Sequence, residues 1–286
     1  MDVLAVHRSL LERLLPDDAP DALVVHEGQF HRVVVGAERV VCLPRSAAAA
    51  ARLPERAAVL RTLAGLDLGF RTPAPLLAAE QRPDGAGYLV LSRVPGAPLE
   101  AAALTAPGVA GAVAEQYAAL LAGMAAAGSD AAVRAALPRA EEDRWRAFAT
   151  GVRTRLYALM SEDGRRRADR ELAALDALPH RTDALVHGDL GAENVLWTTE
   201  DGLPRLSGVV DWDEVVLGDP AEDLAAVGAS YGPDLLAAVR AHGGWTDTAL
   251  DTRIATIRGT FALQQALAAH QDEDAEELAD GLAAYR

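Results

Sequence analysis

The chain has 286 residues, of which 50% are hydrophobic and 24% are charged, and it carries a net charge of −15. These proportions are ordinary for a globular protein, and the length suits one large domain or two lobes. The acidic balance argues against nucleic acid or an anionic membrane surface as a partner. It favours a cationic ligand, or simply solubility.

The counts of lysine and cysteine restrict the possible chemistry and cell compartment. The sequence contains no lysine, so all 27 basic residues are arginines. Cys42 is the only cysteine, which excludes an internal disulfide and fits a reducing, cytoplasmic setting. The N-terminus lacks the basic start and apolar stretch of a secretory signal. No uncharged apolar run is expected to be long enough to span a bilayer.

The first ninety or so residues predict a small β-rich lobe. Between the strands, residues 46–65 are expected to form a helix that Ser46 opens and Gly65 closes, with Pro54 marking a break or a second start. The β-branched runs predict strands within 22–36, 38–44 and 87–94.

The rest of the chain predicts a larger, mostly helical lobe. The segment 95–102, which contains two prolines and a glycine, is the best candidate for a linker. After it, apolar residues recur at spacings of three and four, as on one face of a helix. Helices are predicted over 108–128, 140–160 and 164–180, and long helices resume from about residue 220. This order of elements predicts an α+β fold.

Three short motifs are set aside. "GASYG", around Ser230, fits a hydrolase pattern, but a helical segment precedes it where a strand is needed. Ser230 is therefore expected to end a helix. His26 and His31 in "HEGQFH" are spaced wrongly for a zinc-binding helix. A Walker phosphate loop is excluded, because it needs a lysine and the chain has none.

The segment "LVHGDLGAENVLW" is the strongest functional signal. Asp189 and Asn194 stand five residues apart, and Asp211 follows seventeen residues after Asn194. Between Asn194 and Asp211, two apolar runs flank Asp201 and Gly202, which predicts a β-hairpin with a tight turn. A hairpin brings its two ends together, so one amide oxygen and two carboxylates are expected to converge.

Such oxygen donors suit Mg²⁺, which takes one or two protein carboxylates together with phosphate oxygens. The spacing equals that of the catalytic loop of protein kinases. On that pattern Asp189 is the catalytic base, while Asn194 and Asp211 bind magnesium. The alternative is that these residues cap turns around an ordinary hairpin. His187 is expected to be a structural loop histidine.

"GDPAED" predicts the start of a helix. Asp219, Pro220 and Glu222 have the spacing of a capping box with proline at the first helical position. Asp219 is also expected to hold the catalytic loop through the backbone amides of that loop.

Together, "VHGDLGAENVLW" and "GVVDWDEVVLGDPAEDLA" resemble the two best motifs of the aminoglycoside-phosphotransferase superfamily. Further segments, including "HEGQFHRVVVG", "GLDLGFRTPAP", "LVLSRVPGAPLE", "FATGVRT" and "IRGTFALQQAL", resemble the tuberactinomycin phosphotransferases of that superfamily over nearly the whole chain. The capreomycin-directed members are the favoured match.

The resemblance implies a bilobal protein-kinase-like fold, with a nucleotide-binding lobe over 1–94 and a catalytic and acceptor-binding lobe over 95–286. It implies an ATP- and Mg²⁺-dependent phosphotransferase that inactivates a cationic cyclic-peptide antibiotic, such as capreomycin or viomycin, by phosphorylating a hydroxyl group. Alternatives are a kinase of aminoglycosides or other small alcohols, and a pseudokinase that only sequesters the drug.

The charge distribution independently favours a cationic acceptor. Between 183 and 223 there are eleven acidic residues and one arginine, and the run 271–280 adds six more acids. A cleft lined by carboxylates would attract and orient a polycation. Glu193, Asp213 and Glu214, which flank the proposed catalytic residues, are the predicted acceptor contacts. A solvated acidic surface is the alternative, above all for 271–280.

One departure from the kinase pattern concerns the phosphate-binding lysine, which protein kinases carry on the third strand and pair with a helix glutamate. Cys42 takes its place here. Arg45 could reach the phosphates instead, with Glu55 as its partner, or it could be a surface residue.

The remaining nucleotide contacts are predicted from two short segments. "HEGQFH" is expected to form a lid over the phosphates, with Gly28 allowing close approach and with Gln29 and His31 as donors. Residues 92–94, from Ser92 to Val94, are expected to face the adenine through backbone groups.

Overall fold

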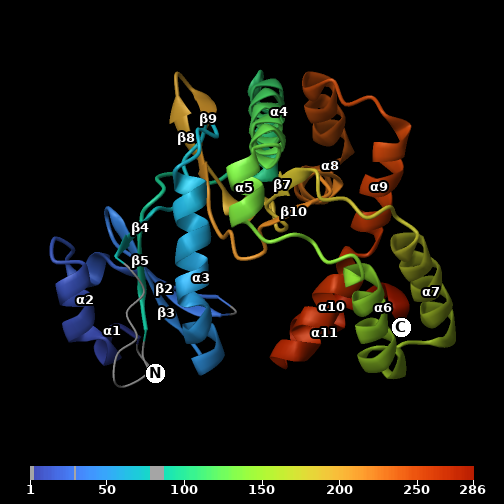
Figure 1. Cartoon of the computed structure of the whole chain (residues 1–286), viewed down its shortest axis with the longest axis horizontal. Helices are drawn as coiled ribbons and strands as arrows, with labels where there is room; N and C mark the ends of the chain where they lie inside the picture. Colours follow the sequence, from blue (N-terminus) through green and yellow to red (C-terminus); the bar gives the residue numbers. More distant parts are fainter. Residues whose placement is uncertain (1–2, 29, 78–86) are drawn as a thin grey trace. The chain divides into compact units, whose positions relative to one another are not determined.

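The computed structural model describes residues 3–28, 30–77 and 87–286. It divides the chain into two compact units. The first unit contains residues 1–99 and 193–213, and the second contains 100–192 and 214–286. Most strands belong to the first unit and most helices to the second (Figure 1). The predicted α+β class is confirmed.

The first unit is built on an antiparallel sheet in the order β1-β2-β3-β5-β4. Successive side chains along each strand point to opposite faces of this sheet. Val41 and Val90 are buried in a core with residues of the N-terminal helices. Val40 and Cys42 point to the opposite face and line a cavity. The strands are β1 Val24–Glu27, β2 His31–Val35, β3 Arg39–Pro44, β4 Pro75–Leu77 and β5 Leu89–Ser92.

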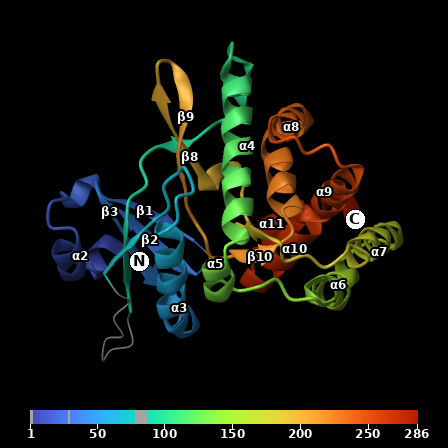
Figure 2. The same ribbon diagram turned by 45° about the horizontal axis from the view of Figure 1, so that its top comes forward.

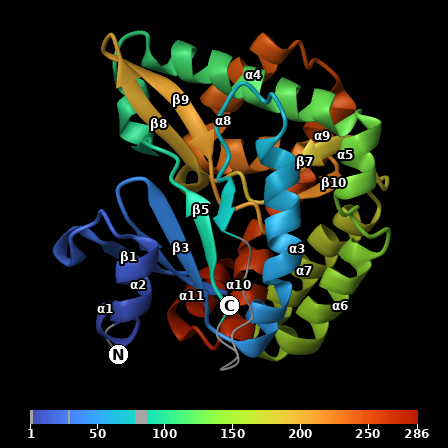
Figure 3. The ribbon, with the colours of Figure 1, turned by 60° about the vertical axis from the view of Figure 1, so that its left-hand side comes forward.

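Three α-helices belong to the first unit: α1 Val3–Val6, α2 Arg8–Leu14 and α3 Ala47–Ala64; a short 3₁₀ turn, η1, spans Pro20–Ala22. Figure 3 shows α3 running beside the sheet. The predicted ends of α3 are confirmed, since the Ser46 hydroxyl accepts a hydrogen bond from the Ala49 N–H at 3.1 Å and Gly65 caps the other end. The expected break at Pro54 is wrong. Pro54 is exposed, and α3 continues through it without interruption.

A hairpin from later in the chain completes the first unit. β8 (Val195–Glu200) and β9 (Leu203–Val209) pair antiparallel, and β6 (Ala97–Pro98) adds to the edge of β8. Asp201 and Gly202 both have positive φ, at 50° and 78°, as a two-residue type I′ turn requires. The predicted hairpin is confirmed, and the predicted linker supplies β6.

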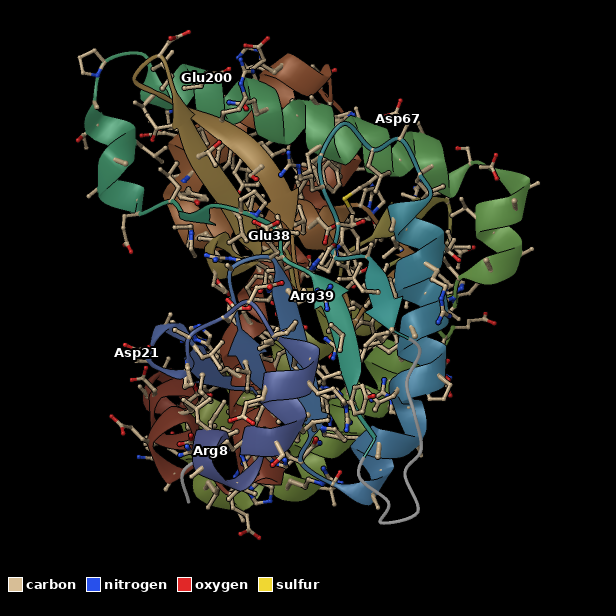
Figure 4. All side chains as sticks on the ribbon, turned by 90° about the vertical axis from the view of Figure 1, so that its left-hand side faces the viewer. Arg8, Asp21, Glu38, Arg39, Asp67 and Glu200 are labelled. Atoms are coloured by element: carbon tan, nitrogen blue, oxygen red, sulfur yellow. The ribbon has the colours of Figure 1, made fainter. Side chains whose placement is uncertain are left out.

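Figure 4 labels Glu200 at the end of β8 and Glu38 in the turn between β2 and β3. Next to Glu38, the Arg39 guanidinium donates a hydrogen bond to the carbonyl oxygen of Leu14 at 3.2 Å. This bond ties the sheet to α2.

The second unit is mostly helical. Its α-helices are α4 Val109–Gly128, α5 Ala131–Ala136, α6 Arg144–Arg155, α7 Glu162–Asp176, α8 Ala221–Gly243, α9 Thr248–Gly259, α10 Phe261–Asp272 and α11 Ala275–Gly281. Its 3₁₀ helices are η2 Ala101–Thr105, η3 Tyr157–Leu159 and η5 Ala283–Tyr285, while η4 (Ala192–Asn194) leads from the second unit into the first. Two short strands, β7 (Ala184–Val186) and β10 (Val216–Gly218), pair antiparallel. The helices predicted from apolar spacing are confirmed, although α6 ends at Arg155, where a short 3₁₀ turn follows.

Helix α4 is the centre of this unit. It lies beside α8 (Figure 2) and also packs on β7. A Cβ atom on Gly128 would lie 2.2 Å from the backbone nitrogen of Leu185, so only glycine permits this approach. By length and composition alone, α4 could cross a membrane. Core helices of soluble proteins meet the same criteria.

Candidate functional site

The loop after β7 carries the predicted base. Gly188 has a φ of 88°, and a Cβ atom there would lie 2.7 Å from the carbonyl oxygen of Glu214. The Asp189 N–H donates to Nδ1 of His187 at 3.2 Å, so that ring nitrogen carries no proton. His187 is fully buried, whereas Asp189 is exposed. The expected structural role of His187 fits this arrangement.

Asp223, in the first turn of α8, holds this loop. Its carboxylate accepts hydrogen bonds from the backbone N–H groups of His187, at 2.9 Å, and Gly188, at 3.1 Å. Burial raises the pKa of Asp223 to about 7, against the effect of the two N–H donors. Asp223 was not predicted, and the role it fills was expected of Asp219.

Asp219 instead begins α8, as the capping-box spacing predicts. Its carboxylate accepts from the Ala221 N–H at 3.0 Å, and Glu222 reaches back to the Asp219 N–H at 3.3 Å. The carboxylate also forms a buried ion pair with Arg253 at 2.9 Å. The expectation that Asp219 holds the catalytic loop is therefore wrong. Asp223, one helical turn further along the chain, faces that loop instead.

Replacing Asp223 with alanine is expected to lower the free energy of unfolding by about 2–6 kcal/mol, since two backbone N–H groups would lose their acceptor at about 1–3 kcal/mol each. Chemical denaturation measures this change. Asp234→Ala is the matched control, because Asp234 is an exposed residue of the same helix. Equal stability of the two variants would contradict the role of Asp223.

Ser230 has a structural role as well. It lies in α8 two residues before Gly232, where a non-helical backbone (φ 87°, ψ 176°) kinks the helix. The straight first half of α8 thus ends near Ser230, as expected. The Ser230 hydroxyl accepts from the Ala192 N–H at 3.0 Å. This bond anchors the chain just before Asn194.

Asn194 and Asp211 lie at the two ends of the β8–β9 hairpin. Val195 and Val209 are paired across the ladder, and the carbonyl oxygen of Asn194 accepts from the Val210 N–H at 2.9 Å. Asn194 is buried, whereas Asp211 is exposed and has a φ of 61°. Aspartate tolerates this left-handed conformation better than most residues. The hairpin therefore brings these two predicted magnesium ligands together.

Both residues line a cavity of about 490 Å³ that belongs wholly to the first unit. This volume is in the usual range for small-molecule sites. Apolar side chains of the sheet form one wall and the hairpin forms another. The sheet contributes Val33, Val35, Val40, Cys42 and Leu91, and the hairpin and its flanks contribute Glu193, Asn194, Leu196, Val210, Asp211 and Trp212.

The predicted lid and hinge residues take different places. Gly28 lines the cavity, and its N–H donates to the carbonyl oxygen of His31 at 2.9 Å. Ser92 and Val94 line the cavity as well. His31 is not among the lining residues; it is buried and contacts Arg56. Gln29 lies outside the described residues.

Arg45 does not line the cavity, as the sequence suggests it could, and Arg56 lies there instead. The Arg45 guanidinium donates to the carbonyl oxygen of Gly28 at 2.8 Å in an exposed position, and it does not line the cavity. Glu55 is exposed on the outer side of α3. The next residue, Arg56, lines the cavity beside Cys42. Arg56 was not predicted, although it lies on the face of α3 that carries the buried apolar residues.

Asp213 pairs with Arg56, with 2.5 Å between its Oδ1 and the arginine Nε. It is thus engaged within the first unit. Of the other predicted acceptor contacts, Glu193 lines the cavity and Glu214 is exposed in the second unit. In the run 271–280, Asp274 caps α11, and its neighbours are mostly exposed.

The donors at the cavity fit magnesium bound together with a nucleotide. In the part of the chain that the structure describes, no group of three or more His, Cys, Asp or Glu could hold a metal ion. One amide and one carboxylate leave most coordination positions to phosphate oxygens and water. Mg²⁺ prefers this arrangement to an all-protein cage.

Three comparisons bear on this site. The model of the "Phosphotransferase enzyme family" matches residues 24–253. The viomycin phosphotransferase of Streptomyces vinaceus is 66% identical, and the match covers 100% of both chains. Among solved structures, the GDP and kanamycin complex of APH(2")-IIia is similar with a TM-score of 0.83 and 19% identity, covering 98% of this chain and 96% of that chain. Macrolide 2'-phosphotransferase type I has a TM-score of 0.71 and 24% identity, with coverage of 100% and 98%. These two structural matches show a shared fold, and the predicted kinase-like architecture is confirmed.

Proposed function

Because the chain belongs to the phosphotransferase enzyme family, we propose that it transfers the terminal phosphoryl group of ATP to a hydroxyl group of a cationic cyclic-peptide antibiotic. Phosphorylation inactivates the drug and makes the protein a resistance enzyme. The observation that carries this proposal is the 66% identity, over the full length of both chains, with a viomycin phosphotransferase. Viomycin and capreomycin are the two acceptors that we propose to test first.

The cavity of the first unit is the proposed ATP site. Backbone groups of residues 92–94 face the adenine at one side. Asn194 and Asp211 would hold a magnesium ion, which would neutralise charge on the phosphate oxygens. Gly28, after the end of β1, covers the phosphates, and Arg45 supports it through a hydrogen bond to the carbonyl oxygen of Gly28.

Asp189 is the proposed base. Its carboxylate accepts a hydrogen bond from the acceptor hydroxyl and takes the proton as the oxygen bonds to phosphorus. The bond between the terminal phosphorus and the bridging oxygen breaks, and ADP leaves with that electron pair. Asp223 and Gly188 act indirectly, because they set the backbone that presents Asp189.

Carboxylates recognise the amines and guanidines of the drug. Glu193 and Glu214 are exposed and are the proposed contacts. Asp213 was predicted for the same task, but its partner is Arg56. We place the reaction in the cytoplasm, where ATP is available. The single cysteine cannot form an internal disulfide, which fits a reducing compartment.

The test is to incubate the protein with Mg-ATP and viomycin or capreomycin, and then to measure the mass of the drug and the formation of ADP. We expect the drug to gain one phosphate in step with ADP. Kanamycin and choline serve as controls for aminoglycoside and small-alcohol kinases, and neither should be modified at a comparable rate. Tight binding of a drug whose mass stays unchanged would instead identify a sequestering pseudokinase.

A further inference from the structure

We infer that Arg56, from helix α3, supplies the cation for the nucleotide phosphates that position 42 lacks, and that Asp213 is the positioning residue that holds it. This inference rests on the proposed ATP site. In protein kinases a strand lysine is the cation and a helix glutamate is its partner. Here the helix provides the cation, and the loop after the hairpin provides the carboxylate.

The position of Arg56 follows from the geometry of α3. Leu53, Ala57 and Leu60 are buried on the face of α3 that packs on the sheet. Arg56 lies on this face, since residues three and four apart share one side of a helix. Its neighbour Glu55 points outward and is exposed. The guanidinium is therefore directed toward the strand position that a lysine would occupy.

The surroundings hold the guanidinium in one place. Asp213 Oδ1 lies 2.5 Å from Nε of Arg56, and Nδ1 of His31 lies 3.2 Å from one of its terminal nitrogens. The Arg56 side chain is 16% exposed, so it is neither free in solvent nor sealed in the core. A fork-shaped donor with a fixed orientation suits the oxygens of a diphosphate better than a mobile one.

The ionisation states agree with this role. Burial alone would lower the pKa of Arg56, but the carboxylates of Asp213 and Asp211 raise it, so the side chain stays charged. Burial lowers the pKa of His31 to about 4, with a further contribution from Arg56, and His31 is therefore neutral at neutral pH. Burial also raises the pKa of Cys42, which remains a thiol. Arg56 is thus the cation of this cluster.

A second guanidinium lines the cavity, but it is engaged elsewhere. Arg93 donates to the backbone carbonyl oxygens of Gly36, at 3.1 Å, and Ala37, at 3.3 Å, in the turn between β2 and β3. Arg56 lines the same cavity as Asp211, whose charge contributes to its raised pKa. A nucleotide with magnesium at Asp211 would bring its phosphates toward Arg56.

The experiment compares the binding of ATP, ADP and adenosine to the wild type and to Arg56→Met by calorimetry. Loss of a charged donor is expected to weaken ATP and ADP binding about 10- to 100-fold, while adenosine binding should stay within about twofold. Arg61→Met is the matched control, because Arg61 is exposed on the same helix. If Arg56→Met does not fold, Arg56→Gln replaces it, since glutamine is neutral and can still bond to Asp213.

The double variant Arg56→Met with Asp213→Asn separates two causes. Should it bind ATP as weakly as Arg56→Met, the lost cation is responsible. Recovery to the wild-type affinity would assign the defect to repulsion by the unpaired Asp213 and would overturn the inference. So would unchanged ATP binding in Arg56→Met, or an equal loss for adenosine. The proposed function fails separately, if the wild type binds ATP but phosphorylates no drug.

Discussion

Replacing Asp189 with alanine is expected to slow phosphoryl transfer by about 10²- to 10⁴-fold, the usual contribution of a positioned general base. The affinity for ATP should hardly change, because Asp189 is not among the residues that line the proposed nucleotide cavity. The loop backbone should also persist, since Asp223 and Gly188 hold it independently of the Asp189 side chain. Single-turnover measurement of drug phosphorylation, combined with ATP titration, checks both parts.

Two further variants sharpen this result. Asp189→Asn keeps the shape of the side chain but cannot take a proton, so it should be about as slow as the alanine variant. Asp234→Ala removes an exposed carboxylate from the same unit and should leave the rate unchanged. A fast asparagine variant would show that Asp189 orients the acceptor without accepting its proton, and full activity of Asp189→Ala would remove the residue from the mechanism.

Replacing Asp211 with asparagine is expected to lower transfer by about 10²-fold or more, in the range found when one preorganised electrostatic contact to a reacting group is lost. The hairpin offers Asn194 and Asp211 as oxygen donors at this end of the cavity, and only Asp211 carries charge. The wild type should bind ATP more tightly with magnesium than without it. In the variant this difference should largely disappear.

Glu27→Gln is the control, because Glu27 lines the same cavity but forms an ion pair with Arg32 at 3.2 Å. Loss of the Glu27 charge should leave the effect of magnesium on ATP affinity unchanged. If Asp211→Asn retained the full magnesium effect on ATP affinity, the metal would have to bind elsewhere, and the kinase-like assignment of the hairpin would be wrong.

Local patterns predicted much of the fold. The turn at Asp201 and Gly202 was predictable because both residues tolerate positive φ, and the ends of α3 were predictable because Ser46 and Gly65 have the chemistry of helix caps. The hairpin then placed Asn194 and Asp211 together. Each of these steps depends on residues that are close together in the sequence, so one sequence is enough to predict it.

Contacts across long sequence distances were not predictable in the same way. Asp223 bonds to a loop 35 and 36 residues earlier, and Asp219 was the more conspicuous residue because it stands in a capping box. One residue of helical register separates Glu55, which points outward, from Arg56, which lines the cavity. Only the packing of α3 on the sheet fixes that register. The available signal was an arginine on the apolar face of a predicted helix.

The assignment of residues 193–213 to the first unit has a consequence for dissecting the protein. These residues interrupt the second unit in the chain, yet they carry Asn194 and Asp211. A fragment cut after Leu99 would contain the sheet, the β1–β2 turn and residues 92–94, but neither of these oxygen donors. The unit with the proposed nucleotide cavity therefore cannot be produced as one contiguous piece of the gene. Exchange of N-terminal segments between relatives would transfer the proposed adenine contacts and leave the proposed metal ligands with the recipient.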